Sequence, residues 1–254
     1  AELINMTLHR DELTDYLNDY LAVSRFSDYC PNGLQVEGKA DIRRLVTGVT
    51  ASQRLIDEAI DRQADAILVH HGYFWKGEAA PLTGIKRNRL AALLANNINL
   101  YAYHLPLDAH PEVGNNTQLA RLMGWNVTGQ VDDSLVMLGE VDGGHTGASL
   151  RRQLSEALEF EVLHIGESED PIETIAWCTG AAQGFLQQAI DAGVDAFVSG
   201  EISEPTVHLA RESGVHYFAA GHHATERGGP AALGLHLAQR FGLSVEFIDL
   251  PIPV

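Results

Sequence analysis

The pattern of apolar and polar positions predicts short buried strands that alternate with amphipathic helices. Between residues 8 and 23, apolar side chains recur at helical spacing with acidic residues between them, which is typical of a helix with one buried face. Leu45–Val49 and Asp65–Val69 are instead short, mostly apolar runs, and they predict buried strands. Strands that alternate with helices in this way are typical of α/β folds.

This pattern occurs twice along the chain. A Thr-Gly pair and an Asp-Ala pair stand at 47–48 and 65–66 in the first copy, and at 179–180 and 195–196 in the second. The offset is 132 residues for the first pair (179 − 47) and 130 for the second (195 − 65), so the connecting segments differ by two residues. We therefore predict an α/β (α+β) fold of two similar duplicated domains, 1–128 and 129–254, with mixed sheets flanked by helices.

The remaining elements follow the same rules. Further helices are expected at 86–96, 148–159 and 206–213, and further strands at 34–36, 100–103, 135–141, 161–165, 217–220 and 244–248.

The composition is that of an ordinary folded protein. Hydrophobic residues make up 45% of the 254 residues and charged residues 20%, which excludes disorder and coiled coil. No apolar run approaches the ~18 residues that cross a bilayer, and no leader pattern opens the chain, so we expect a cytoplasmic protein. Ala1 is not a translated start, and we expect residues 1–5 to be an added or processed end without function.

The charge balance narrows the classes of partner. Asp and Glu outnumber Lys and Arg by 34 to 17, which gives a formal charge of −17. Such a surface repels nucleic acid and attracts metal cations, and an anionic substrate would need a local exception. The two cysteines, Cys30 and Cys178, are too few for a disulfide framework or a thiolate zinc site, and we expect buried thiols.

Histidine is the informative excess, with 12 copies. Six of them lie in three short windows that each follow a predicted strand: His70, His71, His104, His110, His222 and His223. Because ligands bind beyond the carboxyl ends of strands in open α/β sheets, these windows predict a binding site.

The spacing within the windows favours a metal site. His222 and Glu226 are four residues apart at the start of a predicted helix, which places both on one face. His70 and His71 are adjacent, and we expect Gly72 to permit the turn that brings both to one cleft. Asp108 adds a hard oxygen ligand.

Five such ligands are more than one cation needs. Three imidazoles and two carboxylates without thiolate suit zinc, manganese, iron, cobalt or nickel, and they predict two ions ~3.5 to 4 Å apart. Two ions that share a bridging water generate a hydroxide near neutral pH, so hydrolysis is the reaction class that we expect.

Several strings resemble a known family over nearly the whole chain. They are PNGLQVEG (31–38), VTGVTASQ (46–53), VHHGYFWKG (69–77), KRNRL (86–90), HLPLDAHPEVGNN (104–116), SGEISEPTVH (199–208) and GHHATERGG (221–229). The chain resembles the Nif-three-like dinuclear metal proteins, which are labelled GTP cyclohydrolase 1 type 2 homologues. The resemblance implies a duplicated α/β fold, a toroidal homohexamer, a two-metal site inside the ring and a nucleotide substrate. It makes His70, His71, Asp108, His222 and Glu226 the metal ligands, whereas residues 129–175 carry no motif.

Two further residues are candidates for proton transfer. His104 precedes Asp108 by four residues and is either a partner of the metal site that shuttles protons or a structural loop histidine. Glu201 occupies in the second repeat the place that His71 holds in the first (201 − 71 = 130), and is either a substrate contact or general base, or a helix cap. His110 and His223 are expected to be capping or outward residues.

Two other segments have an ordinary and a functional interpretation. Tyr73–Trp75 could stack on a purine, but packing against a helix or a partner subunit is the favoured interpretation. Lys86–Arg89 could attract phosphate, and a solvated helix start or a subunit contact is favoured.

The alternatives to a cyclohydrolase come from two classes. The same metal centre could serve a phosphoesterase or nuclease, or the ring could bind a partner without catalysis. The chain has no GxxxxGK[ST], no GxGxxG after a strand and no GxSxG, so P-loop and serine-nucleophile mechanisms are unsupported.

Overall fold

The computed structural model describes residues 6–254. Residues 1–5, for which no function is expected, lie outside the described residues. The described chain folds as two compact units. The first takes in the described residues up to Gly114 and then Gly229–Leu250, and the second takes in Asn115–Gly228 and Pro251–Val254. Each unit is therefore built from two separate stretches of the sequence. The division into domains 1–128 and 129–254 describes the sequence repeat and stays a prediction.

The first unit is built on a five-stranded sheet with the order β13-β4-β5-β6-β2. Four neighbouring strands run parallel, and the edge strand β2 (Gly33–Val36) is antiparallel to β6. The parallel strands are β4 (Arg44–Thr50), β5 (Ala66–His71), β6 (Asn99–Ala102) and β13 (Ser244–Phe247). The strands β1 (Leu8–His9) and β3 (Asp41–Ile42) form a separate two-stranded antiparallel sheet.

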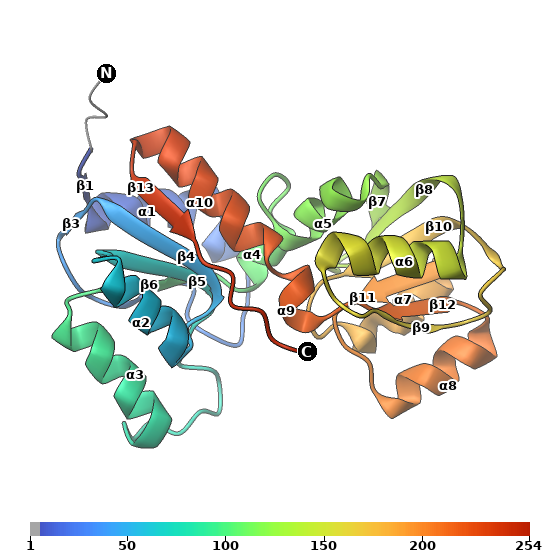
Figure 1. The fold of residues 1–254 in the computed structure, drawn as a ribbon, viewed down its shortest axis with the longest axis horizontal. Helices are drawn as coiled ribbons and strands as arrows, with labels where there is room; N and C mark the ends of the chain where they lie inside the picture. The colour runs from blue at the N-terminus through green and yellow to red at the C-terminus, as the bar shows by residue number, and fades with distance from the viewer. Residues whose placement is uncertain (1–5) are drawn as a thin grey trace. The chain divides into compact units, whose positions relative to one another are not determined.

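Helices cover both faces of this sheet (Figure 1). The helices α1 (Arg10–Tyr20) and α10 (Gly228–Phe241) lie on one face, and α2 (Gln53–Asp61) and α3 (Gly84–Ala95) lie on the other. Successive residues of a strand point to opposite faces, so Leu45 packs with the α1 and α10 core while Val46 packs with the α2 and α3 core. This burial on both sides explains the continuous apolar runs.

The second unit contains a six-stranded mixed sheet with the order β7-β8-β10-β11-β12-β9. Three central strands are parallel: β10 (Pro171–Cys178), β11 (Ala196–Ser199) and β12 (His216–Ala219). The other three are antiparallel to their neighbours: β7 (Asn126–Gln130), β8 (Met137–Thr146) and β9 (Leu163–Ile165).

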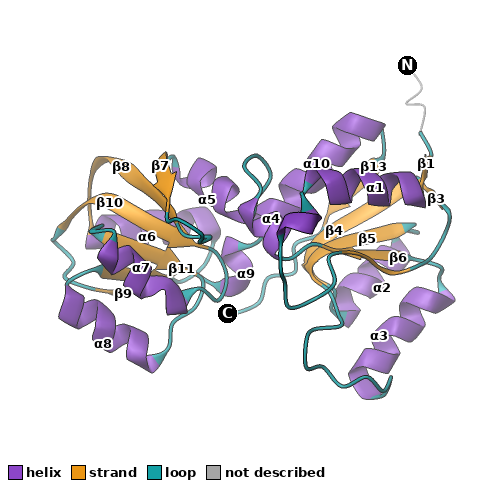
Figure 2. Ribbon diagram, turned by 180° about the vertical axis from the view of Figure 1, so that it is seen from behind, coloured by secondary structure: helices purple, strands orange, loops and turns teal. Residues whose placement is uncertain are grey.

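Helices again cover this sheet on both faces (Figure 2). The helices α5 (Asn115–Met123) and α6 (Gly147–Leu158) pack into the core around Trp177 and Phe218. The helices α7 (Leu186–Asp191) and α8 (Glu204–Ser213) pack into the opposite core around Phe197 and Tyr217. The prediction of an α/β fold with mixed sheets flanked by helices is thus confirmed.

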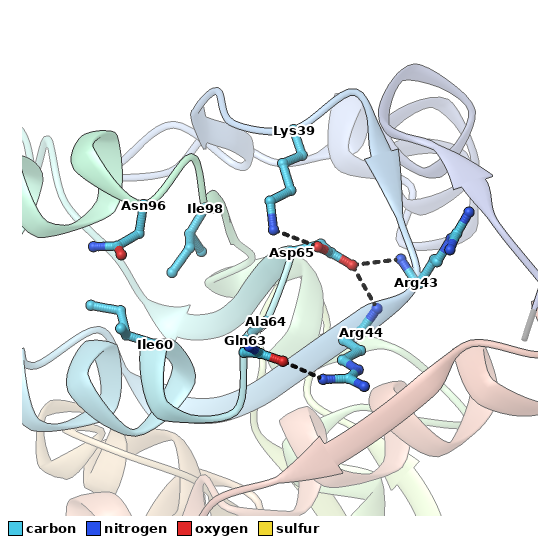
Figure 3. Close-up of a pocket in the computed structure, with 9 residues that line it drawn as sticks. All are labelled: Lys39, Arg43, Arg44, Ile60, Gln63, Ala64, Asp65, Asn96 and Ile98. Carbon is cyan, nitrogen blue, oxygen red and sulfur yellow. Dashed lines mark hydrogen bonds and ion pairs between the residues drawn. The ribbon is translucent and has the colours of Figure 1, made fainter.

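The repeated Asp-Ala pair has the same structural role in both units. In the first unit, Asp65 Oδ2 accepts the backbone N–H groups of Arg43 and Arg44 at 2.9 and 3.0 Å, and Oδ1 lies 2.8 Å from Lys39 Nζ (Figure 3). In the second unit, Asp195 Oδ2 accepts the N–H groups of Glu173 and Thr174 at 2.9 and 3.0 Å. The carboxylate therefore joins the starts of two parallel strands in each unit.

The short elements complete the chain. They are η1 (Val23–Arg25), α4 (Leu105–Ala109), η2 (Gln183–Phe185) and α9 (His222–Thr225). In the part of the chain that the structure describes, no helix combines the length and the apolar character needed to span a membrane.

Candidate metal-binding clusters

Two adjacent histidines end strand β5 in the first unit. His70 is fully buried, and its Nδ1 lies 2.9 Å from the carbonyl oxygen of Tyr103, to which it donates. This bond places the proton on Nδ1 and the lone pair of the neutral ring on Nε2. Nε2 lies 3.4 Å from Oδ1 of Asp108, a buried residue of α4. A metal-binding histidine is typically oriented by such a bond from its other nitrogen.

His71 and His104 join His70 in a group of three imidazoles. One ring nitrogen from each lies within 4.8 Å of the other two, and the ring centroids of His70 and His71 are 4.6 Å apart. His71 Nδ1 is 3.0 Å from Thr50 Oγ1, at the end of the neighbouring strand β4. We name His70, His71, His104 and Asp108 the first cluster.

The histidine pair does not need the turn expected at Gly72. Both histidines still belong to β5, and Gly72 has no left-handed φ. A Cβ at Gly72 would lie 2.3 Å from Gln35 Oε1 and 2.6 Å from the Ala102 side chain. Glycine is required here because the backbone of residue 72 packs closely against the side chains of Gln35 and Ala102. The expectation that Gly72 is needed for a turn was therefore wrong.

A buried carboxylate holds His104. Asp28 Oδ1 accepts from His104 Nδ1 at 2.7 Å, and Oδ2 accepts from the Leu105 N–H and from Asn32 Nδ2, both at 2.9 Å. Burial alone would raise the pKa of Asp28, but the bonds from His104, Asn32 and Leu105 outweigh it and lower the pKa to about 2. The ionised carboxylate fixes the proton of His104 on Nδ1 and leaves the lone pair on Nε2.

The second unit holds a smaller cluster at the start of α9. His222 Nε2 lies 3.1 Å from Glu226 Oε2, and His222 Nδ1 lies 2.6 Å from Glu201 Oε1, just beyond β11. Burial would lower the pKa of His222, but the hydrogen bonds and charges of Glu226 and Glu201 raise it to about 9. We name Glu201, His222 and Glu226 the second cluster.

Glycine makes room for this cluster. A Cβ at Gly180, which has φ +74°, would lie 2.1 Å from Glu226 Oε1 and 3.3 Å from His222 Nε2. Gly180 belongs to the repeated Thr-Gly pair, which thus has a direct structural reason in the second unit. In the first unit, the equivalent Gly48 faces the side chain of Leu55 instead.

The donors of both clusters fit divalent cations. The first offers imidazole nitrogens beside one carboxylate, and the second offers one imidazole between two carboxylates, without thiolate in either. The raised pKa of His222 indicates that the second cluster attracts positive charge. Nitrogen and oxygen donors in these proportions suit zinc, manganese, iron, cobalt and nickel.

A family model matches residues 8–252, almost the entire chain, and its description is Duf34/NIF3 (NGG1p interacting factor 3). The chain belongs to the Duf34/NIF3 family. Relatives called "GTP cyclohydrolase 1 type 2 homolog" include one from Yersinia pestis, 56% identical over 95% of this chain and 98% of the relative. Another, from Pseudomonas aeruginosa, is 52% identical over 98% of this chain and 100% of the relative.

Solved structures agree with this assignment to the NIF3 family. A structure described as "protein ybgI, unknown function" superposes with a TM-score of 0.94 at 51% identity, and covers 97% of this chain and 100% of that one. A structure from Thermus thermophilus superposes with a TM-score of 0.89 at 37% identity, over 97% of this chain and 100% of that one. The resemblance stated from the sequence is confirmed.

The other residues singled out in this NIF3-family chain have ordinary roles. His110 Nδ1 accepts the N–H groups of Glu112 and Val113, as expected of a capping residue, whereas His223 is buried rather than outward. The Tyr73 hydroxyl donates to the Ala51 carbonyl at 2.5 Å inside the core, while the Trp75 ring meets His104 edge-on at 5.0 Å.

The basic segment has partners of its own. Lys86 Nζ donates to the Ala79 carbonyl at 3.0 Å and lies 3.6 Å from Glu78. The segment lies in the first turns of α3, which agrees with the favoured interpretation of a helix start.

Two side chains that orient the first cluster, Asp28 and Thr50, were not predicted from the sequence. Asp28 lies outside every predicted helix and strand, and Thr50 directly follows the predicted strand Leu45–Val49 and ends β4. Only the position of Thr50 at a strand end, beside the end of β5, could have indicated it.

Proposed function

We propose that the protein is a metal-dependent hydrolase of the GTP cyclohydrolase type 2-like kind, which acts on a nucleotide or related small molecule. Its two divalent ions are bound by His70, His71, Asp108, His222 and Glu226. The observation that carries the proposal is the first cluster, in which a buried histidine with its Nδ1 on a backbone carbonyl faces a buried carboxylate. The names of the relatives support the choice of a cyclohydrolase.

Bound divalent ions supply the Lewis acidity that hydrolysis of a nucleotide requires. Around them, the side chains of this chain hold and move protons. Asp28 fixes the His104 tautomer, so His104 Nε2 is the atom that accepts a proton from the attacking water and returns it to the leaving group. Glu201 holds His222 Nδ1 and thereby directs Nε2 toward Glu226.

The first test is elemental analysis of protein purified without added metal. The proposal predicts about two divalent ions per chain, removable with a chelator and lost in Asp108→Asn. The exposed Asp57→Asn is the matched control, because it removes the same charge outside the clusters. Fewer than about one ion per chain contradicts the two-ion proposal.

The second test is a hydrolysis screen of nucleotides that measures formate and phosphate separately. Formate released by the metal-loaded protein, and abolished by chelation, supports a cyclohydrolase. Phosphate release without formate selects the phosphoesterase alternative. Turnover that survives chelation contradicts metal-dependent catalysis, and metal binding without turnover favours a non-catalytic protein that binds a partner.

The homohexameric ring implied by the family resemblance is part of the proposal. Light scattering combined with size exclusion measures the mass directly. A mass of six chains of 27.6 kDa supports the ring, and a monomer contradicts it.

A further inference from the structure

A further pair of histidines lies in the second unit: His164, in the 129–175 segment that carries no motif, and His216, at the start of β12. His164 Nε2 and His216 Nδ1 are 2.9 Å apart, and their rings are stacked with centroids 5.2 Å apart. The His164 ring also stacks on Phe218 at 4.5 Å, nearly parallel. The His216 and Phe218 rings are themselves nearly parallel, with centroids 6.5 Å apart, so two rings of β12 hold the His164 ring in one orientation.

Two glycines make space for this pair. A Cβ at Gly147 would lie 2.5 Å from His164 Cε1, and a Cβ at Gly166 would lie 2.5 Å from His216 Nδ1. Burial, then repulsion from His216 and Arg151, lowers the pKa of His164 to about 4. Burial also lowers the pKa of His216, so both imidazoles are neutral near pH 7. When His164 Nε2 accepts from His216, His164 Nδ1 carries an N–H donor.

His164 lines a hollow of about 390 Å³ beside α6. The other lining residues are Ala148, Arg151, Arg152, Ser155 and Ser168. No lining residue is acidic, although acids outnumber bases two to one in the whole chain. Among the described residues, neither guanidinium forms an ion pair with a carboxylate.

One of the arginines is already oriented. Arg151 Nε donates to the Val162 carbonyl at 2.9 Å, which fixes the plane of the guanidinium and leaves both terminal nitrogens for another acceptor. The hydroxyl of Ser155 accepts the Val162 N–H at 3.2 Å, so its proton is available as a donor. The hollow thus combines the guanidinium groups of Arg151 and Arg152 with hydroxyl and imidazole hydrogen-bond donors.

We propose that this hollow binds a small molecule through its phosphate group. Two guanidinium groups match the double negative charge of a phosphate and offer paired N–H donors to its oxygens. The volume falls within the range of small-molecule sites. The formal charge of −17 opposes a long polyanion such as nucleic acid, whereas a small phosphate meets only this local positive region. The site is independent of the proposed metal centre.

The test is calorimetric titration with inorganic pyrophosphate, using the full chain. The wild type should bind with one saturable site, and Arg151→Gln with Arg152→Gln should weaken binding by about 100-fold, about tenfold for each charge-assisted group. Arg54→Gln, an exposed arginine on α2 outside the hollow, is the matched control and should change binding by less than about twofold.

A second pair of variants tests the imidazole. His164→Phe keeps a ring to stack on Phe218 but removes the nitrogen donor, and should weaken binding by about tenfold. The exposed His208→Phe on α8 should leave binding unchanged. Amide shifts on titration should be confined to residues around Arg151, Arg152 and Ser168.

Two results with the wild type and the double arginine variant would overturn the proposal. One is the absence of saturable binding in a wild type whose thermal unfolding shows it to be folded. The other is wild-type affinity in the double arginine variant. The titration is repeated in Asp108→Asn, because binding lost in that variant alone means that pyrophosphate goes to the metal centre and not to this hollow.

Discussion

The two units carry the same three parallel strands and the same aspartate that joins two strand starts, Asp65 or Asp195, here called the Asp cap, yet their strand ends differ. In the first unit, β5 ends with His70 and His71, whereas in the second unit β11 ends at Ser199 and is followed by Gly200 and Glu201. The Thr-Gly pair is retained, but its neighbours differ, since Gly48 faces the Leu55 side chain and Gly180 faces Glu226. The duplicated scaffold therefore keeps the residues that join its strands and changes the residues at the strand ends and the side chains packed against the repeated glycine.

The largest expected effect comes from removing a proposed ligand of either unit. Asp108→Asn and Glu226→Gln should each lower kcat by at least about 100-fold, because loss of a ligand should exceed the 10- to 100-fold cost of losing a residue that only orients one. Steady-state kinetics with the hit of the nucleotide screen measures this. The exposed Glu212→Gln on α8 is the control for Glu226. If one of the two variants retains full turnover, the unit that carries the substituted residue does not take part in catalysis.

Each unit has a carboxylate that orients a histidine: Asp28 with His104 in the first unit and Glu201 with His222 in the second. Asp28→Asn should lower kcat by about 10- to 100-fold at nearly unchanged metal content, because it releases the His104 tautomer. Nitrogen NMR of His104 should show the proton leave Nδ1 for a mixture of tautomers, a readout that does not depend on activity. An unchanged tautomer in a folded variant contradicts the positioning role of Asp28.

Glu201→Gln should have a smaller effect in the second unit. Its side chain is 40% exposed, so we expect at most about tenfold weaker metal binding. Competition with a chelator measures the affinity. A loss larger than that of Glu226→Gln would mean that Glu201 is itself a ligand.

The Thr-Gly pair offers a matched test at equivalent positions. Gly180→Ala should displace Glu226 and reduce metal content, and should lower the free energy of unfolding by about 1–3 kcal/mol, since φ is +74° and the Cβ overlaps a buried carboxylate. Gly48→Ala meets only the end of the Leu55 side chain, so it should cost about 1 kcal/mol and leave the metal content unchanged. Equal metal loss in both variants would contradict the distinction.

The Asp caps of the two units, Asp65 and Asp195, should make similar, pH-dependent contributions to stability. Hydrogen bonds outweigh the effect of burial and lower the pKa of both Asp65 and Asp195. Their stabilisation is therefore fully present above the unfolded pKa of about 3.9 and is lost as pH falls through the lower folded value. Asp65→Asn and Asp195→Asn should each cost about 1–2 kcal/mol at pH 7 and less at pH 3. Urea unfolding at both pH values tests this, and a loss that grows on acidification contradicts it.

The sequence predicts the central strands β5, β6, β11 and β12 because their apolar runs are buried, but it does not predict the short β1 and β3 or the mostly exposed β7. It misses α10, whose start at Gly228, Gly229 and Pro230 resembles a turn, although proline is compatible with the first turn of a helix. In the same way, none of the helices expected from the sequence includes the Pro106 segment, which forms α4 with proline in its first turn.

The candidate ligands were predicted because they follow strands, but their orienting partners were not. Asp28 lies 76 residues from His104, and no local pattern relates the two. The Tyr103 carbonyl that holds His70 is a backbone group and carries no residue-type signal. The reason for Gly72 depends on Gln35 and Ala102, which are distant in sequence.

The most direct test of the central proposal is the metal content per chain of three proteins dialysed together: the wild type, Asp108→Asn and Glu226→Gln. The proposal predicts about two ions in the wild type and a clear loss in each variant, because both residues are ligands. Full metal content in either variant, with the fold intact, would contradict the proposed five-residue ligand set.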